Sequence, residues 1–224
     1  MSESQKNKKE SPMNKITILE KGHEAFKRVK FKANEARFKK LVSEGQNPKA
    51  LFIGCSDSRV MPNMITSTGA GDLFIVRNIG NFVPTFHPDS DFHATAAAIE
   101  YAVSVLEVND IIVCGHSHCG AISALYKPLV PTEENIHTIK WLELGSMAKH
   151  VAKTALPQAE KSELLDYTEK VSVIFQLENL LTYPAVKRGV AEGTLFLHGW
   201  HYDLESGEIA YYDDSEMVFK ALGE

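Results

Sequence analysis

Five short runs of apolar residues recur along the chain, each bounded by polar or turn-forming residues. They are ALFIG at 50–54, LFIV at 73–76, IIVC at 111–114, TLFLHGWHY at 194–202 and EIAYY at 208–212. Apolar runs of this length are typical of strands in the interior of a sheet. The pattern therefore predicts five strands, and Glu205-Ser206-Gly207 is expected to form the turn between the last two.

The segments between these runs carry apolar residues at helical spacing. We expect helices over 16–44, ending at Gly45, over 91–106, with Asp91 as N-cap, over 120–126, and over 133–182, with a break near Pro157 and one more helical turn after Pro184. Strands that alternate with helices favour a mainly parallel sheet with helices on both faces. The sequence therefore predicts the α/β fold class.

Length and composition are those of one globular domain. The 224 residues suffice for one sizeable core and are too few for two full domains. The polar segment 1–14 is expected to be a disordered tail. Residues 15–224 are expected to form a single α/β domain, with an N-terminal helical arm over 15–45. No apolar run approaches the roughly 18 residues that a membrane helix needs. The N-terminus also lacks the apolar core of a signal peptide, so we expect a cytoplasmic protein without membrane association.

Charge is spread unevenly. Residues 1–50 hold 13 of the 24 basic residues and 6 acidic ones, so the remainder carries a net charge of −12. Because the basic residues alternate with apolar ones at helical spacing, they describe solvated faces of amphipathic helices, and we expect no nucleic-acid partner. A basic arm that packs on an acidic neighbouring subunit would also account for the asymmetry.

Two motifs stand where predicted strands end. CSDSR at 55–59 follows the first apolar run, and HSHC at 116–119 follows the third. The carboxyl ends of adjacent parallel strands lie at one edge of a sheet, so these side chains converge if the two strands are neighbours. Thiolate sulfur and imidazole nitrogen are the ligands that zinc prefers. Three cysteines are too few for a disulfide framework, so Cys55, His116 and Cys119 are the candidate zinc ligands.

Two further residues near these motifs are not expected to bind the metal. Cys114 lies inside an apolar run, which favours a buried small hydrophobic residue. His118 stands between two candidate ligands in the sequence and would point away from a metal that both of them bind.

The two motifs together resemble those of the β-class carbonic anhydrases. The similarity runs from about Asn34 to Asp203 and includes GQNPKALFIGCSDSRV, GDLFIVRNIGN, AAAIEYAV, IIVCGHSHCGAI and HGWHYD. It implies zinc bound by Cys55, His116 and Cys119, and a catalytic dyad of Asp57 and Arg59. It also implies four parallel strands with an antiparallel edge strand, and an obligate homodimer that often pairs into a homotetramer.

The residues themselves support reversible hydration of CO2 to bicarbonate and a proton. Zinc lowers the pKa of bound water toward about 7, which supplies hydroxide to attack CO2. Asp57 can orient that hydroxide, and Arg59 can keep Asp57 ionised through a bidentate pair. The backbone N–H of Gly120 can bind the developing oxyanion. If Asp57 instead moves onto zinc as a fourth ligand, the site closes, so activity is expected to rise with pH.

The resemblance also indicates substrate and regulatory positions. Gln46 matches a glutamine that reaches the zinc-bound ligand of a partner subunit. Other matches indicate an apolar CO2 pocket lined by Phe74, Ile79 and Tyr101. Some family members add a regulatory bicarbonate pocket, built partly from a tryptophan where this chain has Phe52. Arg77 and Tyr202 match other positions of that pocket, but the missing indole N–H favours the subgroup without this regulation. As proton shuttles, His87 and His93 are candidates.

Other functions remain open at this level. A hydrolase of CS2 or COS on the same fold would use the same motifs, because those substrates are also linear and apolar. A non-catalytic zinc-binding regulatory module is a second alternative, although it would not need the Asp57–Arg59 pair. Cysteine phosphatases separate Cys and Arg by five residues, and here three intervene between Cys55 and Arg59.

Overall fold

The computed structural model describes residues 12–89 and 91–223, which divide into two compact units after Gln46. In the first unit, α1 (Pro12–Ala25) continues through a π-helical turn (Phe26–Phe31) toward α2 (Glu35–Glu44). Gly45 ends α2 with a φ of 83° that favours glycine. The one or two helices predicted over 16–44 are thus present as α1 and α2 with the π-helical turn between them. Of the predicted tail, residues 1–11 lie outside the described part, and residues 12–14 belong to α1.

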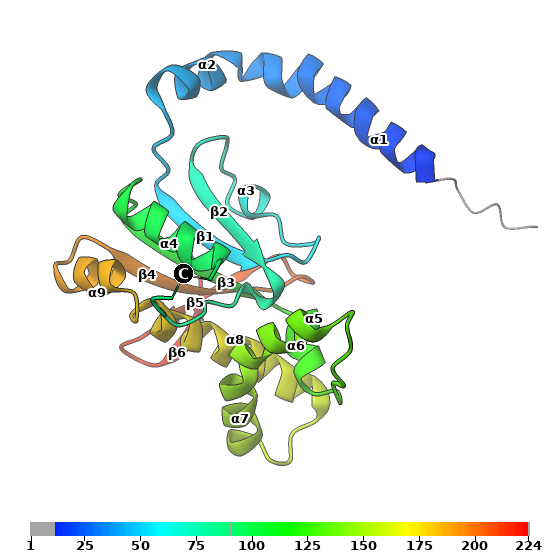
Figure 1. Cartoon of the computed structure of the whole chain (residues 1–224), viewed down its shortest axis with the longest axis vertical. Helices are drawn as coiled ribbons and strands as arrows, with labels where there is room; N and C mark the ends of the chain where they lie inside the picture. Colours follow the sequence, from blue (N-terminus) through cyan, green and yellow to red (C-terminus); the bar gives the residue numbers. More distant parts are fainter. Residues whose placement is uncertain (1–11, 90, 224) are drawn as a thin grey trace, which may run out of the picture. The chain divides into compact units, whose positions relative to one another are not determined.

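The second unit is built on a mixed, mostly parallel six-stranded sheet (Figure 1). Its strands are β1 (Ala50–Cys55), β2 (Leu73–Asn78), β3 (Asp110–His116), β4 (Phe196–Tyr202), β5 (Ile209–Asp213) and β6 (Val218–Ala221). They lie in the order β2-β1-β3-β4-β5-β6. The first four are parallel to one another, and β5 pairs antiparallel with β4. The predicted α/β fold is therefore confirmed.

The sheet has a sixth strand, β6, that the sequence pattern did not predict. β6 rather than β5 therefore forms this edge of the sheet. β6 pairs antiparallel with β5 from Asp213↔Val218 to Ala210↔Ala221. The turn between them is held by Asp213, whose Oδ1 accepts bonds from the backbone N–H groups of Ser215 at 3.0 Å and Glu216 at 3.2 Å. A four-residue strand of which only the inner residues are half-buried carries little apolar pattern, which is why it escaped prediction.

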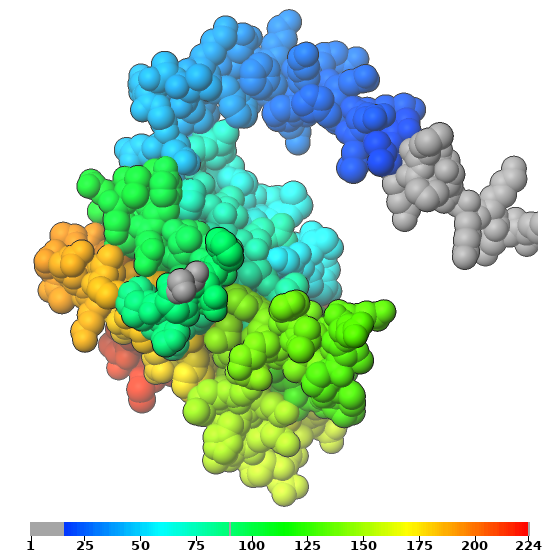
Figure 2. All heavy atoms as spheres, viewed as in Figure 1, coloured from blue at the N-terminus to red at the C-terminus, as the bar shows by residue number. Residues whose placement is uncertain are grey.

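Helices surround the sheet in the second unit. They are α3 (Pro62–Ile65), α4 (Ala94–Ser104), α5 (Gly120–Leu125), α6 (Ile136–Leu142), α7 (Ser146–Ala155), α8 (Lys161–Leu180) and α9 (Pro184–Ala191), with 3₁₀ turns at Ile79–Asn81 and Glu143–Gly145. The break expected near Pro157 separates α7 from α8. In the space-filling view, green residues of α4 and of the segment before it cover part of the sheet (Figure 2).

The start of α4 differs from the prediction. The helix begins at Ala94, and His93 rather than Asp91 occupies the N-cap position, without a side-chain cap. Asp89 organises the preceding turn instead, because its Oδ1 accepts bonds from the Asp91 N–H and from His93 Nε2, both at 2.8 Å. A local side-chain hydrogen bond thus delays the helix by three residues.

Alternate residues of the central strands face opposite sides of the sheet. Leu51, Ile53, Ile111 and Val113 pack with Val173 of α8 and with residues of α4 and α9 in the main core. On the other side, Phe52, Ile112 and Cys114 form a smaller core with Ile65, Trp200 and Tyr202 among their neighbours. Among the described residues, no helix is both long enough and apolar enough to span a bilayer.

Glycine lets α8 approach β3 closely. A Cβ on Gly115 would lie 2.7 Å from Val173 Cγ2, which is closer than two carbon atoms can pack. The same contact places the preceding turn of α8, which carries Glu169, beside the end of β3. The side chain of Glu169 thereby reaches the segment that follows the strand, which matters for the site described below.

Candidate metal centre

Cys55, His116 and Cys119 meet at the carboxyl edge of the sheet. Cys55 is the last residue of β1 and His116 the last residue of β3, and these two strands are parallel neighbours. Cys119 immediately precedes α5. One ligand atom from each residue lies within 4.8 Å of those of the other two. All three are nearly inaccessible to solvent, with exposed fractions of 5%, 0% and 2%. The predicted convergence of the two motifs is therefore present.

This cluster fits a zinc ion by its chemistry. Two sulfurs and one imidazole are a zinc donor set that leaves a fourth position for water or substrate. His116 Nδ1 donates to the carbonyl of Ser117 at 2.9 Å, which leaves Nε2 as the free ligand atom. That Nε2 atom is buried and has no hydrogen-bond partner. A buried imidazole nitrogen without a partner is unfavourable unless a cation binds it.

The two buried thiols affect each other's pKa. The interaction with Cys119 lowers the pKa of the Cys55 thiol to about 4, and the interaction with Cys55 raises the pKa of the Cys119 thiol. Cys55 therefore ionises more readily than Cys119. A cation that binds both sulfurs displaces the remaining thiol proton, as expected for a thiolate metal site.

Cys114 behaves differently from the other two cysteines. It is fully buried, and burial raises the pKa of its thiol to about 12. It is not part of the metal-binding cluster. The prediction that Cys114 is a small buried core residue agrees with this position.

Asp57 and Arg59 form a bidentate pair beside the cluster. Arg59 Nε donates to Asp57 Oδ1 at 2.9 Å, and Arg59 Nη2 donates to Asp57 Oδ2 at 2.7 Å. The Arg59 backbone N–H also bonds Oδ1, at 3.0 Å. Hydrogen bonding to the guanidinium holds the pKa of the Asp57 carboxyl well below its usual range, so the carboxyl is ionised at neutral pH. Asp57 is not among the residues of the metal-binding cluster.

Arg77 fixes the loop that carries this pair. Its Nε donates to the carbonyl of Cys55 at 2.9 Å, and its Nη2 donates to the carbonyl of Asp57. The resemblance had indicated Arg77 only as a possible regulatory residue. Its bonds to the backbone depend on the pairing of β1 with β2, which places Gly54 opposite Arg77 and Cys55 opposite Asn78.

A cavity of about 320 Å³ opens on the metal centre. Its lining residues are Cys55, Ser56, Asp57, Ile79, Gly120, Ala121, Ala124, Thr138 and Leu142. Of the predicted substrate residues, Ile79 and Gly120 are in this set. A Cβ added at Gly120 would meet nothing within 4 Å, so its backbone borders open space. Ala121 and Ala124 of α5 and Thr138 and Leu142 of α6 were not predicted by the sequence analysis.

Phe74 and Tyr101 do not line this cavity. Their rings pack against each other with centroids 5.8 Å apart, and Tyr101 borders a separate cavity with residues of α9. Gln46 is exposed and is the last residue of the first unit. Within the second unit, Phe74 and Tyr101 are therefore not among the residues that line the cavity at Cys55.

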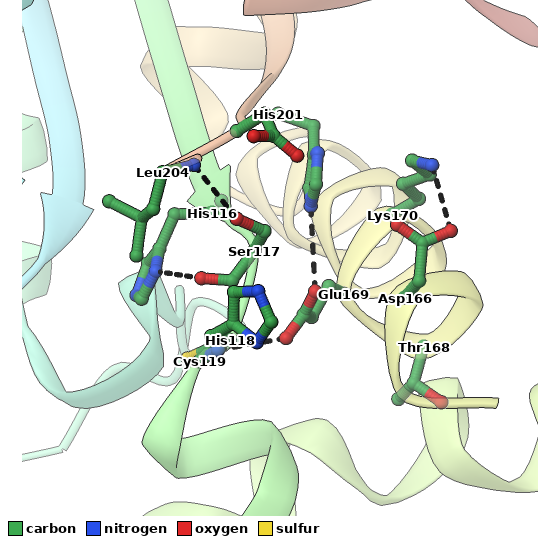
Figure 3. Close-up of polar contacts among 12 residues, drawn as sticks. His116, Ser117, His118, Cys119, Asp166, Thr168, Glu169, Lys170, His201 and Leu204 are labelled. Carbon is green, nitrogen blue, oxygen red and sulfur yellow. Dashed lines mark hydrogen bonds and ion pairs between the residues drawn. The ribbon is translucent and has the colours of Figure 1, made fainter. Parts of the chain in front are cut away.

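Residues around the ligands hold their backbone in place. Ser117 donates its backbone N–H to the carbonyl of Tyr202 at 3.0 Å, and its Oγ accepts from the Leu204 N–H at 2.8 Å (Figure 3). His118, which has a φ of 58°, bonds Glu205 Oε1 through Nε2 at 3.0 Å. As expected, its side chain is not part of the metal-binding cluster.

The candidate proton shuttles differ in their position. His93 lines a cavity of about 450 Å³ that shares Ser56 and Ile79 with the metal cavity. His87 borders a cavity that shares no residue with the metal cavity. The proposed regulatory position, Phe52, is fully buried, and its ring lies edge-on to that of Trp200 with centroids 6.3 Å apart.

Comparison with known proteins agrees with this geometry. The family model described as carbonic anhydrase matches residues 50–209. A carbonic anhydrase of Pseudomonas aeruginosa is 42% identical over 199 residues, which cover 89% of this chain and 88% of that protein. Carbonic anhydrase 1 of Escherichia coli O157:H7 is 40% identical and covers 88% of each chain.

Solved structures show the same fold. The β-carbonic anhydrase CcaA superposes with a TM-score of 0.88 at 38% identity and covers 94% of this chain and 93% of that one. A tetrameric β-carbonic anhydrase of Sordaria macrospora superposes with a TM-score of 0.77 at 29% identity, over 94% and 98% of the two chains. The chain therefore belongs to the β-class of the carbonic anhydrase family (EC 4.2.1.1).

Proposed function

We propose that the chain hydrates CO2 to bicarbonate and a proton at a zinc ion, with Asp57 and Arg59 as a catalytic dyad. The observation that carries this proposal is the bidentate Arg59–Asp57 pair, because Asp57 lines the same cavity as Cys55. A structural zinc site would need neither this pair nor an open cavity. Both features therefore support a catalytic site rather than a regulatory module.

Cys55, His116 and Cys119 would hold the zinc ion. Bound zinc lowers the pKa of water toward about 7 and so supplies a strong nucleophile at neutral pH. Ser117 positions the imidazole, because its carbonyl accepts a hydrogen bond from His116 Nδ1–H and keeps Nε2 available. The two sulfurs would bind as thiolates, after loss of any remaining thiol proton.

Asp57 orients the attacking water in this proposal. Its carboxylate accepts a hydrogen bond, so the lone pair of the water oxygen points into the cavity. Arg59 donates one hydrogen bond to each carboxylate oxygen of Asp57, which keeps Asp57 ionised. Arg77 donates hydrogen bonds to the backbone carbonyls of both Cys55 and Asp57, which fixes the position of the Asp57 carboxylate relative to the Cys55 sulfur.

The cavity wall suits CO2. Ile79, Ala121, Ala124 and Leu142 supply an apolar surface, which a linear molecule without a dipole prefers to a polar one. The Gly120 N–H is the proposed donor to the oxygen that gains negative charge. We propose that Gln46, Phe74 and Tyr101 complete a CO2 pocket only from a second copy of the chain, since Phe74 and Tyr101 do not line the cavity within one copy.

The rate is expected to depend on pH in one direction. CO2 hydration should rise between about pH 6.5 and about pH 9, because a bound zinc would supply more hydroxide at higher pH, and this hydroxide would compete better than water with Asp57 for the metal. Stopped-flow measurement on the zinc-quantified protein tests this. A rate that does not change over the same pH range would contradict the proposed closed state, in which Asp57 would be a fourth zinc ligand.

We propose a homodimer or homotetramer as the working form, in which 15–224 is one zinc-enzyme domain with a helical arm over 15–45. Large apolar side chains of the arm are exposed, namely Ile16, Ile18, Leu19, Phe26, Val29 and Val42. Exposed apolar residues in such numbers are typical of an interaction surface. The homologous structure from Sordaria macrospora is tetrameric, which supports the same view.

Deleting residues 1–35 is expected to lower the mass of the assembly. The deletion removes five of the six exposed apolar side chains of the arm, so the contacts that they make with another copy are lost. Light scattering measures the mass directly, and deletion of residues 1–11 alone is the matched control. An unchanged mass in the longer deletion would show that the arm does not hold the assembly together.

A further inference from the structure

A second group of side chains that could hold a metal ion lies near Cys119. It consists of Asp166 and Glu169 on α8 and His201 on β4 (Figure 3). One ligand atom from each residue lies within 4.8 Å of those of the other two. None of the three belongs to the cluster of Cys55, His116 and Cys119. Their sequence separation of up to 35 positions means that only the packing of α8 on β4 brings them together.

His201 is the observation that points to a ligand. Its exposed fraction is 4%, and its Nε2 atom has no hydrogen-bond partner. Glu169 Oε2 lies 3.6 Å from this atom, which is too long for a hydrogen bond. The buried imidazole nitrogen therefore faces a carboxylate without being bonded to it. A cation between the two groups would give this nitrogen a partner.

The surrounding charge also favours a cation. A cavity of about 630 Å³ reaches Asp166 and Glu169 from the side of α8 that bears Glu163. Asp203 and Glu205 line the same cavity, which brings its carboxylates to five. Lys170 is a counter-charge, because its Nζ donates to Asp166 Oδ2 at 2.8 Å. The Oδ1 atom of Asp166 remains for a metal.

We propose that Asp166, Glu169 and His201 bind a second divalent transition-metal ion, separate from the zinc of the Cys–His–Cys centre. One imidazole and two carboxylates favour ions such as Mn²⁺, Fe²⁺, Co²⁺ or Zn²⁺. Mg²⁺ and Ca²⁺ prefer all-oxygen sites. The half-exposed Asp166 provides the entry side, and the buried His201 provides the inner ligand.

Glu169 joins the two centres. Its Oε1 accepts the backbone N–H of Cys119 at 2.8 Å, while its Oε2 faces His201. One carboxylate therefore positions a zinc ligand and offers its other oxygen to the second ion. Glu169 was absent from the predicted site, because its contact with Cys119 spans 50 residues and no local pattern encodes it.

The test uses the assembled protein loaded with one zinc per chain. Mn²⁺ is added as the probe, because it is the weakest competitor for thiolate sites and does not displace zinc from Cys55 and Cys119. Binding is followed by the loss of the free Mn²⁺ electron paramagnetic resonance signal, and metal analysis after zinc saturation counts zinc per chain. We expect one Mn²⁺ per chain, and two zinc ions per chain at saturation.

Three variants separate this site from general attraction to acidic groups. Asp166→Asn and His201→Gln are expected to weaken Mn²⁺ binding about tenfold or more, which corresponds to about 1.4 kcal/mol. Glu163→Gln, in the same cavity but outside the triad, should leave it nearly unchanged. Asp166 is half-exposed, so its variant should fold even if the His201 variant does not.

Two results would overturn the proposal. One is the absence of both stoichiometric Mn²⁺ and a second zinc ion. The other is an equal effect of Asp166→Asn and Glu163→Gln, which would indicate diffuse attraction to the acidic cavity. Neither readout depends on catalytic activity, so the second site is tested independently of the reaction at the first.

Discussion

Replacing Cys55 with serine is expected to abolish both zinc binding and CO2 hydration, with a rate loss of at least about 10³-fold. Cys55 has a lowered thiol pKa, and its sulfur lies within 4.8 Å of the ligand atoms of His116 and Cys119. A serine hydroxyl does not ionise at neutral pH and is a weak zinc ligand. Metal analysis and stopped-flow CO2 hydration measure the two losses on the same sample.

Cys114→Ala is the matched control for this change. Cys114 is also a buried cysteine of the central sheet, but its pKa of about 12 keeps it a neutral thiol and it lies outside the cluster. This variant should keep one zinc per chain and its activity, with some loss of stability from the small cavity. If Cys55→Ser retained full zinc content, the assignment of Cys55 as a ligand would be wrong.

Asp57→Asn is expected to keep the zinc and to lower the hydration rate by about 10²-fold. The amide is close in shape to the carboxylate, but it carries no charge and pairs poorly with the guanidinium of Arg59. It therefore accepts the hydrogen bond of the attacking water weakly and in the wrong orientation. Zinc per chain and the pH profile of the rate are measured together.

Arg59→Lys distinguishes orientation from charge. Lysine keeps the positive charge beside Asp57 but cannot form the two parallel bonds seen at 2.9 and 2.7 Å. We expect a smaller rate loss than in Asp57→Asn, again with full zinc content. Wild-type rates in Asp57→Asn would mean that the pair only holds the loop, and the dyad would have to be abandoned.

The local pattern of residues was enough to predict most of the sheet. Apolar runs at 50–54 and 111–114 are long enough to identify buried strands, and the ligand motifs begin where those runs stop. Elements with a weak apolar pattern or an irregular start were not predicted correctly. β6 is short and only half-buried, and the start of α4 depends on the side chain of Asp89. Element boundaries of this kind are set by single hydrogen bonds rather than by periodicity.

For the site, motif and resemblance indicated Cys55, His116 and Cys119, and the structure brings these three together. Most residues of the cavity wall were not predicted from the sequence. Thr138 and Leu142 come from α6, and their approach depends on how that helix packs after α5. Phe74 and Tyr101 were expected to line the CO2 pocket, and within one copy they pack on each other and do not line the cavity.

The sequence by itself determined five of the six strands, the ligand types and their location at strand ends, because these follow from apolar runs and donor chemistry along a few consecutive residues. Only the tertiary structure decided that β1 and β3 are neighbours, that Arg77 anchors the loop that carries Asp57, and that Glu169 lies between Cys119 and His201. Such contacts join residues that are far apart in the chain. The position of Glu169 depends on the close packing of α8 over Gly115, which no local repeat of residues records.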